Sequence, residues 1–475
     1  MNIISYLQSR GIDTVDSSFY RRIEEWQSWY KSRVKGFSFY RVYSGQGTYN
    51  RRKRKSLGMA KKVCEDIADL LLNEKVVITI DDTATDEFVQ DVLKRNRFLV
   101  VGNDYQERKA YTGTAAYIPY LDNMEIDEAG NVYSGEIGIN YVSGLGIYPV
   151  SWHNGIVTEC AFAFTKTVNR KKYVHIQFHI LEAGKYVIEN AVLECTAGSR
   201  EGKELRPEEW KQLKPFENLV QKIYTDSTEP QYVIDRLNIV NNADDDESNP
   251  MGIAIYANAI DVLKKLDTEY DSYSNEFELG RKRIFVAPEM VTYKDGSPAF
   301  DPEDTVFYKF PDDYKGNDGK EGMIHEVDMT IRADEHSKAI NDDLNYLSLK
   351  CGFGTDRYQF EAGNVKTATE VISENSDMFR MLKKHEIILE DVLKELIRII
   401  IRLGIVLNVP LNPDAEIIIE FDDSIIEDKA AERSTDRQDV AMGAMPLYEY
   451  REKWYGETEE VAKTKVQTPE QEIIE

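Results

Sequence analysis

The most regular pattern in the chain is an apolar repeat in its last third. Leucine recurs every seven residues from Leu382 to Leu403, with further apolar residues on the same side. This spacing predicts one very long helix over residues 366–404, ended by Gly404, which needs lateral support from other helices. Apolar residues at helical spacing predict shorter helices over residues 14–33, 57–72, 82–100, 251–279 and 333–351.

Between residues 106 and 200 the pattern changes to short runs in which apolar and polar residues alternate. Such runs, separated by turn residues, predict antiparallel strands. They lie at residues 115–119, 132–139, 160–167, 172–181 and 184–194. Residues 1–75 are otherwise expected to be helical, with short strands over Lys75–Ile80 and Glu416–Phe421 and strands and turns within 281–330. The expected fold class is α+β, mainly α-helical.

Two polar segments separate these elements. The acidic run Asp244–Glu247 is followed by Pro250, which predicts an exposed linker and a helix that begins at the proline. The segment after the helix at 333–351 contains Gly352, Gly354 and Gly363, and this glycine content predicts a loop that tolerates positive φ.

Length and charge limit the possible functions. The chain has 475 residues, so we expect about two to four subdomains. Lys and Arg number 59 against 84 Asp and Glu, which gives a net charge of −25. A protein that grips DNA by neutralising phosphates should be basic, so this chain is not a simple DNA grip. An acidic wall would let a duplex slide, although solubility alone explains the charge more simply.

The cysteines and the apolar runs indicate the compartment. No two of Cys64, Cys160, Cys195 and Cys351 have the spacing of metal ligands, so neither a zinc site nor a disulfide framework is indicated. A reducing compartment is therefore expected. The first ten residues lack the apolar core of a signal peptide, and no run approaches the roughly 18 apolar residues of a membrane span.

Motifs of nucleotide hydrolysis and nucleophilic catalysis are missing from the sequence. Gly198–Lys203 and Gly316–Lys320 have neither the spacing nor the following Ser or Thr of a P-loop, and no nucleophile elbow occurs. His175 and His179 lie on one face of a predicted strand and could ligate a metal. Two half-exposed strand residues are the more common case.

Acidic clusters are the remaining candidates for chemistry. The pairs Asp312/Asp313 and Asp422/Asp423 and the run Asp244–Glu247 could bind a divalent cation, as nucleases do. Exposed acidic turns are common, however, and nothing in the sequence converges on them. We therefore expect no enzyme activity, no metal and no cofactor.

An order of elements remains that local chemistry does not explain: helix, β insertion, helix, glycine loop and very long helix. Several sequence stretches within and around these elements are distinctive. They are Ser56–Asn73, Asn249–Asp261, Asp267–Phe277, Gly280–Val286, Leu349–Gly354 with Phe360, Lys366–Asp377, Phe421–Ser424 and Gly456–Glu460. With these stretches the sequence resembles the portal proteins of long-tailed phages of Gram-positive bacteria. The resemblance is strongest over residues 249–380 and most specific over Lys366–Asp377.

The resemblance implies a portal fold with wing, stem, clip and crown that assembles as a ring of about twelve copies around a DNA channel. Its parts would be the wing (1–250), stem helix 1 (251–280), the clip (281–331), stem helix 2 (332–351), the tunnel loop (352–365), the long wing helix (366–404) and the crown (405–475). Twelve copies at −25 sum to roughly −300, so the channel wall would repel phosphate on balance.

Partners and location follow from the same resemblance. The ring would sit at the unique capsid vertex of the virion after assembly in the host cytoplasm. It would serve genome packaging, retention and ejection. Besides double-stranded viral DNA, its partners would be terminase, a head-completion or adaptor protein, scaffold and the major capsid protein, with no membrane.

Residues near DNA or partners are also carried over by the resemblance. The tunnel loop would place at the channel Gly352, Phe353, Gly354, Thr355, Asp356, Arg357, Tyr358, Gly363, Asn364 and Lys366. On the second stem helix, Lys338 and Lys350 would contact phosphate or, equally, form salt bridges between subunits. Clip docking would use Arg281, Lys282, Arg283, Asp312, Asp313 and Lys315.

Two alternatives stay open from the sequence. One is a metal-dependent phage hydrolase or nuclease. The other is a different ring-forming component of the head–tail connector.

Overall fold

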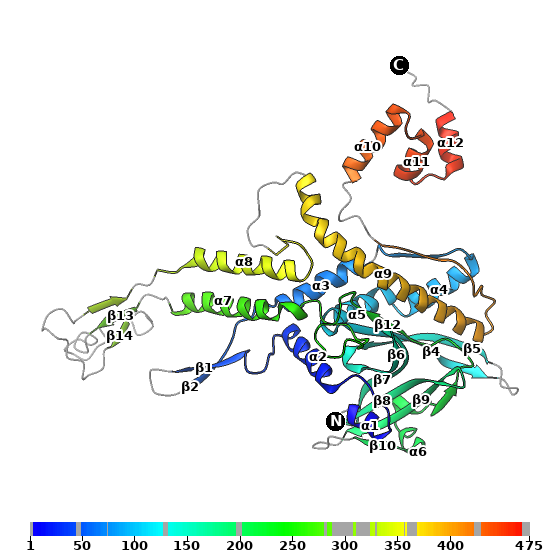
Figure 1. Cartoon of the computed structure of the whole chain (residues 1–475), viewed down its shortest axis with the longest axis horizontal. Coiled ribbons are helices and arrows are strands. Elements are labelled where there is room, and N and C mark those ends of the chain that lie inside the picture. The colour runs from blue at the N-terminus through cyan, green and yellow to red at the C-terminus, as the bar shows by residue number, and fades with distance from the viewer. Residues whose placement is uncertain are drawn as a thin grey trace, which may run out of the picture.

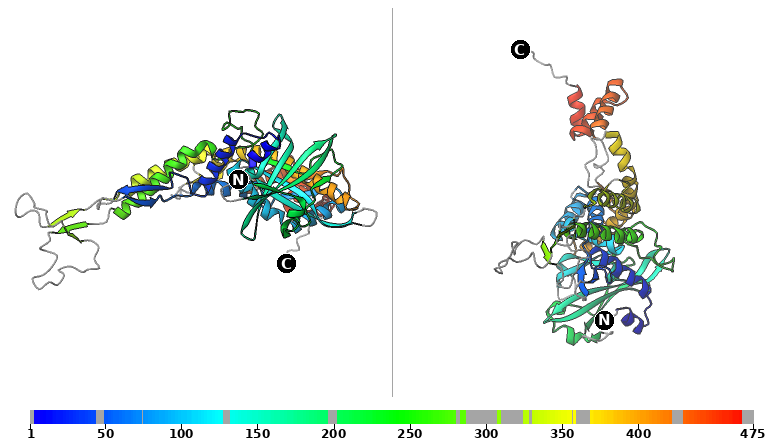
Figure 2. Two further views of the ribbon diagram at one scale, coloured as in Figure 1. Left: turned by 90° about the horizontal axis from the view of Figure 1, so that it is seen from below. Right: turned by 90° about the vertical axis from the view of Figure 1, so that its left-hand side faces the viewer.

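The chain folds into a mixed α/β body from which two long antiparallel helices project (Figure 1). The computed structural model describes residues 3–43, 49–73, 75–126, 132–195, 202–279, 283–286, 307–309, 324–327, 330–355, 357–358, 368–421 and 429–467. The body contains most of the strands, three short strands lie beyond the far ends of the two helices, and a small group of C-terminal helices lies apart from both (Figures 1 and 2). Helices and sheets together confirm the α+β class.

Two antiparallel sheets form the centre of the body. One has the strand order β12 (Val233–Arg236), β4 (Thr114–Ile126), β5 (Val132–Ser143). The other contains β6 (Ile147–His153), β7 (Ile156–Val168), β8 (Lys171–Glu182), β9 (Lys185–Cys195), β10 (Lys203–Leu205) and β11 (Lys222–Tyr224). All the strands expected between residues 106 and 200 are confirmed, and most are longer than predicted.

Two-residue turns explain why the second sheet is a regular meander. The pairs Asn154–Gly155, Asn169–Arg170 and Ala183–Gly184 join its consecutive strands, and both residues of each pair have positive φ. Such turns match the twist of the strands that they connect.

The N-terminal part departs from the expectation of helix throughout. Its helices are α1 (Ile3–Ser9), α2 (Ser17–Tyr30), α3 (Met59–Leu71), α4 (Thr83–Arg95) and α5 (Phe98–Thr112). The helix predicted over 82–100 is thus two helices, because Arg97 has φ +51° and the Asn96 side chain bonds to the Val92 and Ile137 carbonyls. Between α2 and α3 lies an unpredicted hairpin of β1 (Phe39–Tyr43) and β2 (Tyr49–Lys53).

Helix α9 (Ala368–Val406) is the long helix that the leucine repeat predicted. It packs against α3, α4, β4, β5, β12 and β16, so its apolar side finds the support that such a length requires. The expected end at Gly404 is wrong, since the helix continues to Val406 and Asn408 takes the positive φ. Gly404 is needed inside the helix because a Cβ there would meet the Phe88 and Leu411 side chains.

The first projecting helix, α7 (Ile260–Leu279), begins ten residues later than Pro250 predicted. Residues 251–254 are buried and belong to no helix or strand, and the Ile255 amide donates a hydrogen bond of 2.8 Å to the Ala110 carbonyl. Gly113 and Gly252 meet so closely that a Cβ on Gly113 would lie 2.1 Å from the Gly252 carbonyl oxygen. Burial against α5 and β4 therefore overrides the local preference for a helix at the proline.

The remaining elements complete the chain. They are the 3-10 turns η1 (Gly144–Gly146), η2 (Lys214–Phe216) and η3 (Ala257–Ala259), helices α6 (Pro207–Trp210), α8 (Ala333–Lys350), α10 (Lys429–Met442), α11 (Leu447–Tyr455) and α12 (Glu459–Gln467), and strands β3 (Val77–Ile80), β13 (Arg283–Val286), β14 (Phe307–Lys309), β15 (Ile324–Val327) and β16 (Ile417–Glu420). Strand β16 pairs with β3, and β13 lies between β14 and β15. No helix within these described ranges has the length and apolar character that crossing a membrane requires.

Candidate functional site

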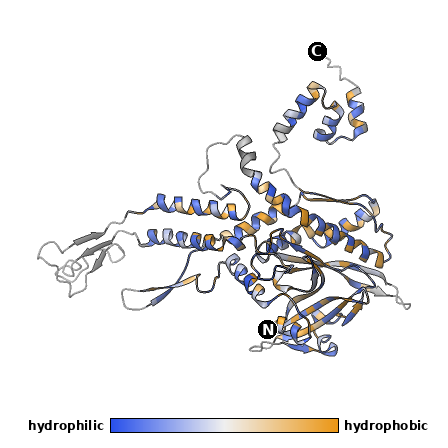
Figure 3. Cartoon of the chain, viewed as in Figure 1, coloured by the Kyte–Doolittle hydropathy of each residue, from blue (hydrophilic) through white to orange (hydrophobic). Residues whose placement is uncertain are grey.

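The two projecting helices, α7 and α8, lie side by side and form the most distinctive surface of the molecule (Figures 1 and 2). Leu263 and Leu266 of α7 and Ile340, Leu344 and Leu347 of α8 are buried. They recur at helical spacing, so one apolar stripe of each helix is covered. The other sides are mainly polar, with a few exposed apolar residues such as Tyr346 and Leu349, and α7 and α8 carry more hydrophilic residues than α9 (Figure 3).

Two charged contacts fix the relative position of these helices. Nearer the body, the Lys265 amine donates to the Asp343 carboxylate over 2.7 Å, and the Asp343 side chain is only 3 % exposed. Nearer the tip, the Arg332 side chain and backbone N–H both donate to Glu276, with Nε 2.7 Å from Oε1. The Arg332 hydrogen bond lowers the pKa of Glu276. The two helices are thus held together near both of their ends.

The β1–β2 hairpin lies along the opposite side of α7 from α8. The Tyr40 hydroxyl and the Lys55 N–H donate to Asp271 over 2.8 and 2.9 Å, and the Leu57 N–H donates to Asp267 over 2.9 Å. Farther out, Lys55 bonds to Glu278, and this bond lowers the pKa of Glu278. Burial raises the pKa of Asp267 in spite of its hydrogen bonds.

A sequence signal for this docking existed and was missed. Asp267, Asp271 and Glu278 are spaced by four and seven residues, which puts them on one face of α7. The basic run Arg51–Lys55 supplies the opposite charge, and Arg52 and Lys55 pair with Glu278. The acidic residues of α7 and this basic run lie far apart in the sequence. The sequence alone therefore does not show that they pair with each other rather than with other charged residues.

The segment after α8 is partly buried. Gly352 and Gly354 have φ of +86° and +78°, as the glycine content predicted. Phe353 and Tyr358 are buried, however, and their rings lie 6.0 Å apart. The Tyr358 hydroxyl donates a hydrogen bond of 2.8 Å to Asp66 of α3, and burial raises the pKa of Tyr358.

Some of the described residues in and near this segment are exposed. Thr355 and Arg357 are exposed, and an Arg357 nitrogen lies 4.0 Å from Asp66. Lys338 is exposed on α8, whereas the Lys350 amine donates to the Asn258 carbonyl over 3.1 Å. Lys350 is thus already bonded to the turn that precedes α7.

The structure brings the expected loop residues Gly352–Thr355 with Arg357 and Tyr358 to the base of the two helices, and Arg283 begins strand β13 beyond their tips. The other predicted positions lie outside the described residues: Arg281, Lys282, Asp312, Asp313, Lys315, Asp356, Gly363, Asn364 and Lys366.

The paired histidines on β8 do not form a ligand site. His179 is fully buried between the Phe162 and Tyr232 rings, and burial lowers its pKa to about 3. His175 stacks on Phe164, and its ring bonds to Asn190 over 2.8 Å. The expectation that both are half-exposed is therefore wrong for His179, because the second sheet packs on both faces. In the described part of the chain, no three His, Cys, Asp or Glu gather as metal ligands would.

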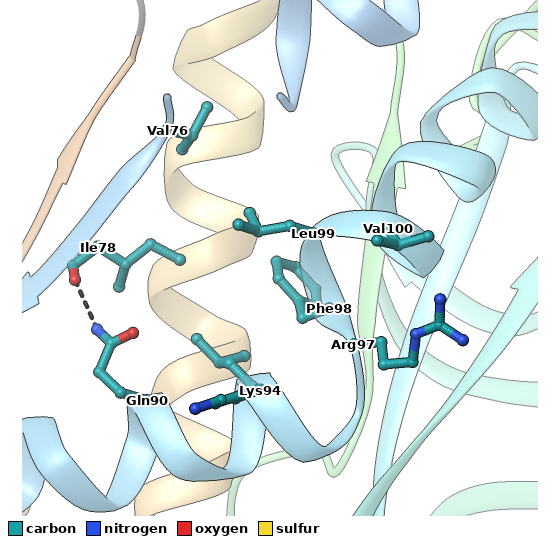
Figure 4. A pocket seen from close by; sticks show the side chains of 9 residues that line it. Val76, Ile78, Gln90, Lys94, Arg97, Phe98, Leu99 and Val100 are labelled. Carbon is teal, nitrogen blue, oxygen red and sulfur yellow. Dashed lines mark hydrogen bonds between the residues drawn. The ribbon is translucent and has the colours of Figure 1, made fainter. Parts of the chain in front are cut away.

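One apolar hollow of about 340 Å³ opens between β3, α4 and α5 (Figure 4). Phe98 and Leu99 point into it, and the Gln90 amide donates to the Ile78 carbonyl at its edge over 2.7 Å. Its charged lining residues, Lys94 and Arg97, have the same sign. An acid–base pair is thus missing from its lining, and we assign no chemistry to it.

A buried charged cluster lies deeper in the body. The Lys109 amine donates to both Asp235 oxygens over 2.8 and 3.0 Å, and both side chains are at most 1 % exposed. Gln106 and Tyr117 also donate to Asp235. Burial lowers the pKa of Lys109, against the attraction of Asp235. The cluster is closed to solvent and joins α5, β4 and β12, so it is structural.

Sequence comparison gives a family that agrees with this arrangement. The chain matches the family described as "Phage portal protein, SPP1 Gp6-like" over residues 11–472, nearly its whole length. A search of curated proteins gives no significant match.

Proposed function

The chain belongs to the family of SPP1 Gp6-like phage portal proteins, and from this premise we propose that it forms the ring-shaped DNA channel at the unique vertex of a phage capsid. Proteins of the family are structural rather than enzymatic and are components of the virion capsid. A metal-dependent hydrolase is accordingly not favoured. We further propose that its phage is long-tailed and infects Gram-positive bacteria, and that the ring assembles in the host cytoplasm.

The observation that carries the proposal is the projecting pair α7 and α8 within a chain that matches the family almost from end to end. In the proposed ring of about twelve copies, these helices would be the stem around the bore. Residues 1–250 and 366–404 would form the wing, 281–331 the clip, 352–365 the tunnel loop and 405–475 the crown.

Charge supports a channel that guides a duplex without binding it tightly. At −25 per copy, the ring repels phosphate overall, so local cations would determine where DNA makes contact. Arg357 and Lys338 are exposed beside the stem and are the described candidates. Lys366 is a further candidate in the tunnel loop. Lys350 is a weaker one, because its amine already binds the Asn258 carbonyl.

The tip of the stem is the proposed docking end. Its small sheet lies farthest from the body, where it is accessible to terminase during packaging and to a head-completion or adaptor protein afterwards (Figure 1). We propose that Arg281, Lys282, Arg283, Asp312, Asp313 and Lys315 make these contacts. The wing and crown would meet scaffold and the major capsid protein.

The decisive experiment is electron microscopy of the purified full chain. A class average down the ring axis should show a closed ring with a central hole, and its subunit number would follow directly. ATP-driven packaging into procapsids with and without the chain tests the channel. A chain that stays monomeric at high concentration and is absent from virions would refute the proposal, and rings that do not co-purify with terminase would indicate another connector component.

A further inference from the structure

Along strands β1 and β2, the side of the hairpin that faces away from α7 carries cations and aromatic rings. Tyr40 and Arg52 are cross-strand partners and bond to α7, so they mark the inner face. Because side chains alternate along strands, the outer face is made of the other cross-strand pairs. These pairs are Phe39 with Lys53, Arg41 with Arg51 and Tyr43 with Tyr49. We call these six residues the hairpin face.

The hairpin face lies in the most basic stretch of an acidic protein. Residues 26–64 contain no Asp or Glu, although the whole chain carries a net charge of −25. The stretch contains eleven cations: Lys31, Arg33, Lys35, Arg41, Arg51, Arg52, Lys53, Arg54, Lys55, Lys61 and Lys62. Inner-face cations are neutralised by Glu278, but the outer face has no acid of its own strand to pair with.

Within one chain the cations of the hairpin face lie close together, and Arg51 stacks over the Phe39 ring, 3.9 Å from its centroid. Arg41 and Arg51 are directly opposite each other and both are exposed, and like charges in that position repel. Tyr43 and Tyr49 are 62 % and 68 % exposed, with rings 5.3 Å apart. An acidic partner with apolar side chains would relieve both conditions, since tyrosine and arginine are enriched at protein interfaces.

A complementary surface lies on the other flank of the same helix pair. The side of α8 that faces away from α7 carries Glu335, Lys338, Asp342, Tyr346 and Leu349, at steps of three and four residues. All five are exposed, and Tyr346 and Leu349 are 59 % and 53 % exposed. We call this set the helix stripe. It combines carboxylates with two large apolar groups, although Lys338 reduces its net charge.

The two surfaces cannot meet within one chain, because α7 lies between them (Figure 1). They can meet between copies that are repeated head to tail, which is the arrangement of a closed ring. We propose that the hairpin face of each copy docks onto the helix stripe of the next copy. This inference rests on the proposed ring and specifies which surfaces close it.

Duplex DNA is the less suitable occupant of the hairpin face. Its phosphates would pair with the three cations, but its bases are already stacked inside the helix and offer nothing to Tyr43 or Tyr49. The matching stripe on α8 would also have no role. DNA binding is therefore an outcome that the experiment must separate from docking.

The test exchanges charges in the full chain. The hairpin variant is Arg41→Glu with Arg51→Glu, and the helix variant is Glu335→Lys with Asp342→Lys. Each alone puts like charges across the interface, so the fraction of chain in rings should fall about tenfold or more. An equal mixture of the two should restore rings, because every contact then joins opposite charges. Lys31→Glu with Lys35→Glu, two exposed cations outside the hairpin, makes the same charge change and should leave rings intact.

The outcomes are distinct. Rings of the hairpin variant at the wild-type level, or a mixture that fails to assemble although circular dichroism shows both variants folded, would overturn the docking but not the ring. Wild-type chain that forms no rings would overturn the proposed function together with this inference. Normal rings of the hairpin variant, with loss of duplex binding in a mobility-shift assay, would reassign the face to nucleic acid.

A measurement without charge changes serves as the second test. The photo-crosslinker p-benzoylphenylalanine replaces Tyr49 in an otherwise unchanged chain, and the ring is irradiated. Mass spectrometry should identify crosslinks between copies to a peptide within residues 333–350. Crosslinks exclusively to other regions would refute the docking.

Discussion

The Tyr358 hydroxyl bonds to the Asp66 carboxylate over 2.8 Å and so connects residues 292 positions apart in the sequence. Asp66 lies on α3 and also accepts from Lys62 over 2.7 Å. The bond attaches the segment after α8 to the body. In the proposed channel it would set how far the tunnel loop can move, because Tyr358 fixes one point on it.

Removing this hydroxyl should loosen the segment. We expect Tyr358→Phe to lower the free energy of unfolding by about 1 to 2 kcal/mol, since buried Asp66 then loses a donor. Urea unfolding measures this. Tyr346→Phe removes a hydroxyl from an exposed tyrosine and should change stability by less than about 0.5 kcal/mol. Equal effects of the two variants would contradict the role of the bond.

Gly354 should be intolerant of proline. Its φ is +78°, whereas proline fixes φ near about −65°, so Gly354→Pro must displace the loop. We expect ring assembly to continue while packaging falls, measured as DNA per particle. Gly443 has a similar φ of +75° in open space, and Gly443→Pro controls for backbone strain alone. Normal DNA content in Gly354→Pro particles would contradict the tunnel-loop assignment.

The Lys109–Asp235 pair should be sensitive to the loss of one partner. Asp235→Ala leaves a buried ammonium group without its anion, and we expect a cost of about 3 to 5 kcal/mol. Replacing both, as Lys109→Met with Asp235→Leu, should cost much less because no buried charge remains. Urea unfolding of wild type, Asp235→Leu, Lys109→Met and the double variant completes a double-mutant cycle. A double variant as unstable as Asp235→Ala would contradict this explanation.

Acid should destabilise the body through His179. Its pKa is about 3 in the folded chain against 6.5 as the ordinary value, because burial excludes the charged ring. Below pH 6.5 the unfolded chain therefore binds a proton at this side chain that the folded chain does not bind. The free energy of unfolding falls as the pH drops toward about 3. At pH 5 the loss from this group is about 2 kcal/mol.

The measurement compares urea midpoints at pH 7 and pH 5. His179→Phe keeps a ring between Phe162 and Tyr232 and should show a smaller decrease than wild type. His153→Gln, at an exposed position, should keep the wild-type decrease. A His179→Phe decrease equal to that of wild type would show that other groups account for the acid sensitivity.

Elements with a strong local period could be predicted from the sequence. The helix at 333–351 is found at Ala333–Lys350, and the long helix at 366–404 is found at Ala368–Val406. Strands β7 to β9 of the meander followed from alternation and turn residues in the same way, whereas β6 was not predicted. These patterns are local, because each arises from residues a few positions apart that share one buried face.

Features determined by distant contacts could not be predicted. The start of α7 depends on the close packing of Gly252 against Gly113. The sequence around Pro250 contains no signal for this contact. The burial of Tyr358 depends on its bond to Asp66 of α3, and no pattern near Tyr358 in the sequence indicates this contact. The β1–β2 hairpin is stabilised by α7, more than two hundred residues away. For the candidate site, the sequence thus indicates the order of parts but not their contacts.

The close fit of Gly113 and Gly252 has a mechanical consequence. The backbone that leads into α7 touches the backbone at the end of α5 with no side chain between them, and the Gly252 N–H is bonded to Thr114 over 2.9 Å. Such a joint has no side chains between the two backbones that could give way, so the segment that leads into α7 cannot shift at this point without breaking it. A load applied along the helix pair is transmitted directly to the sheets, and bending has to occur beyond this joint.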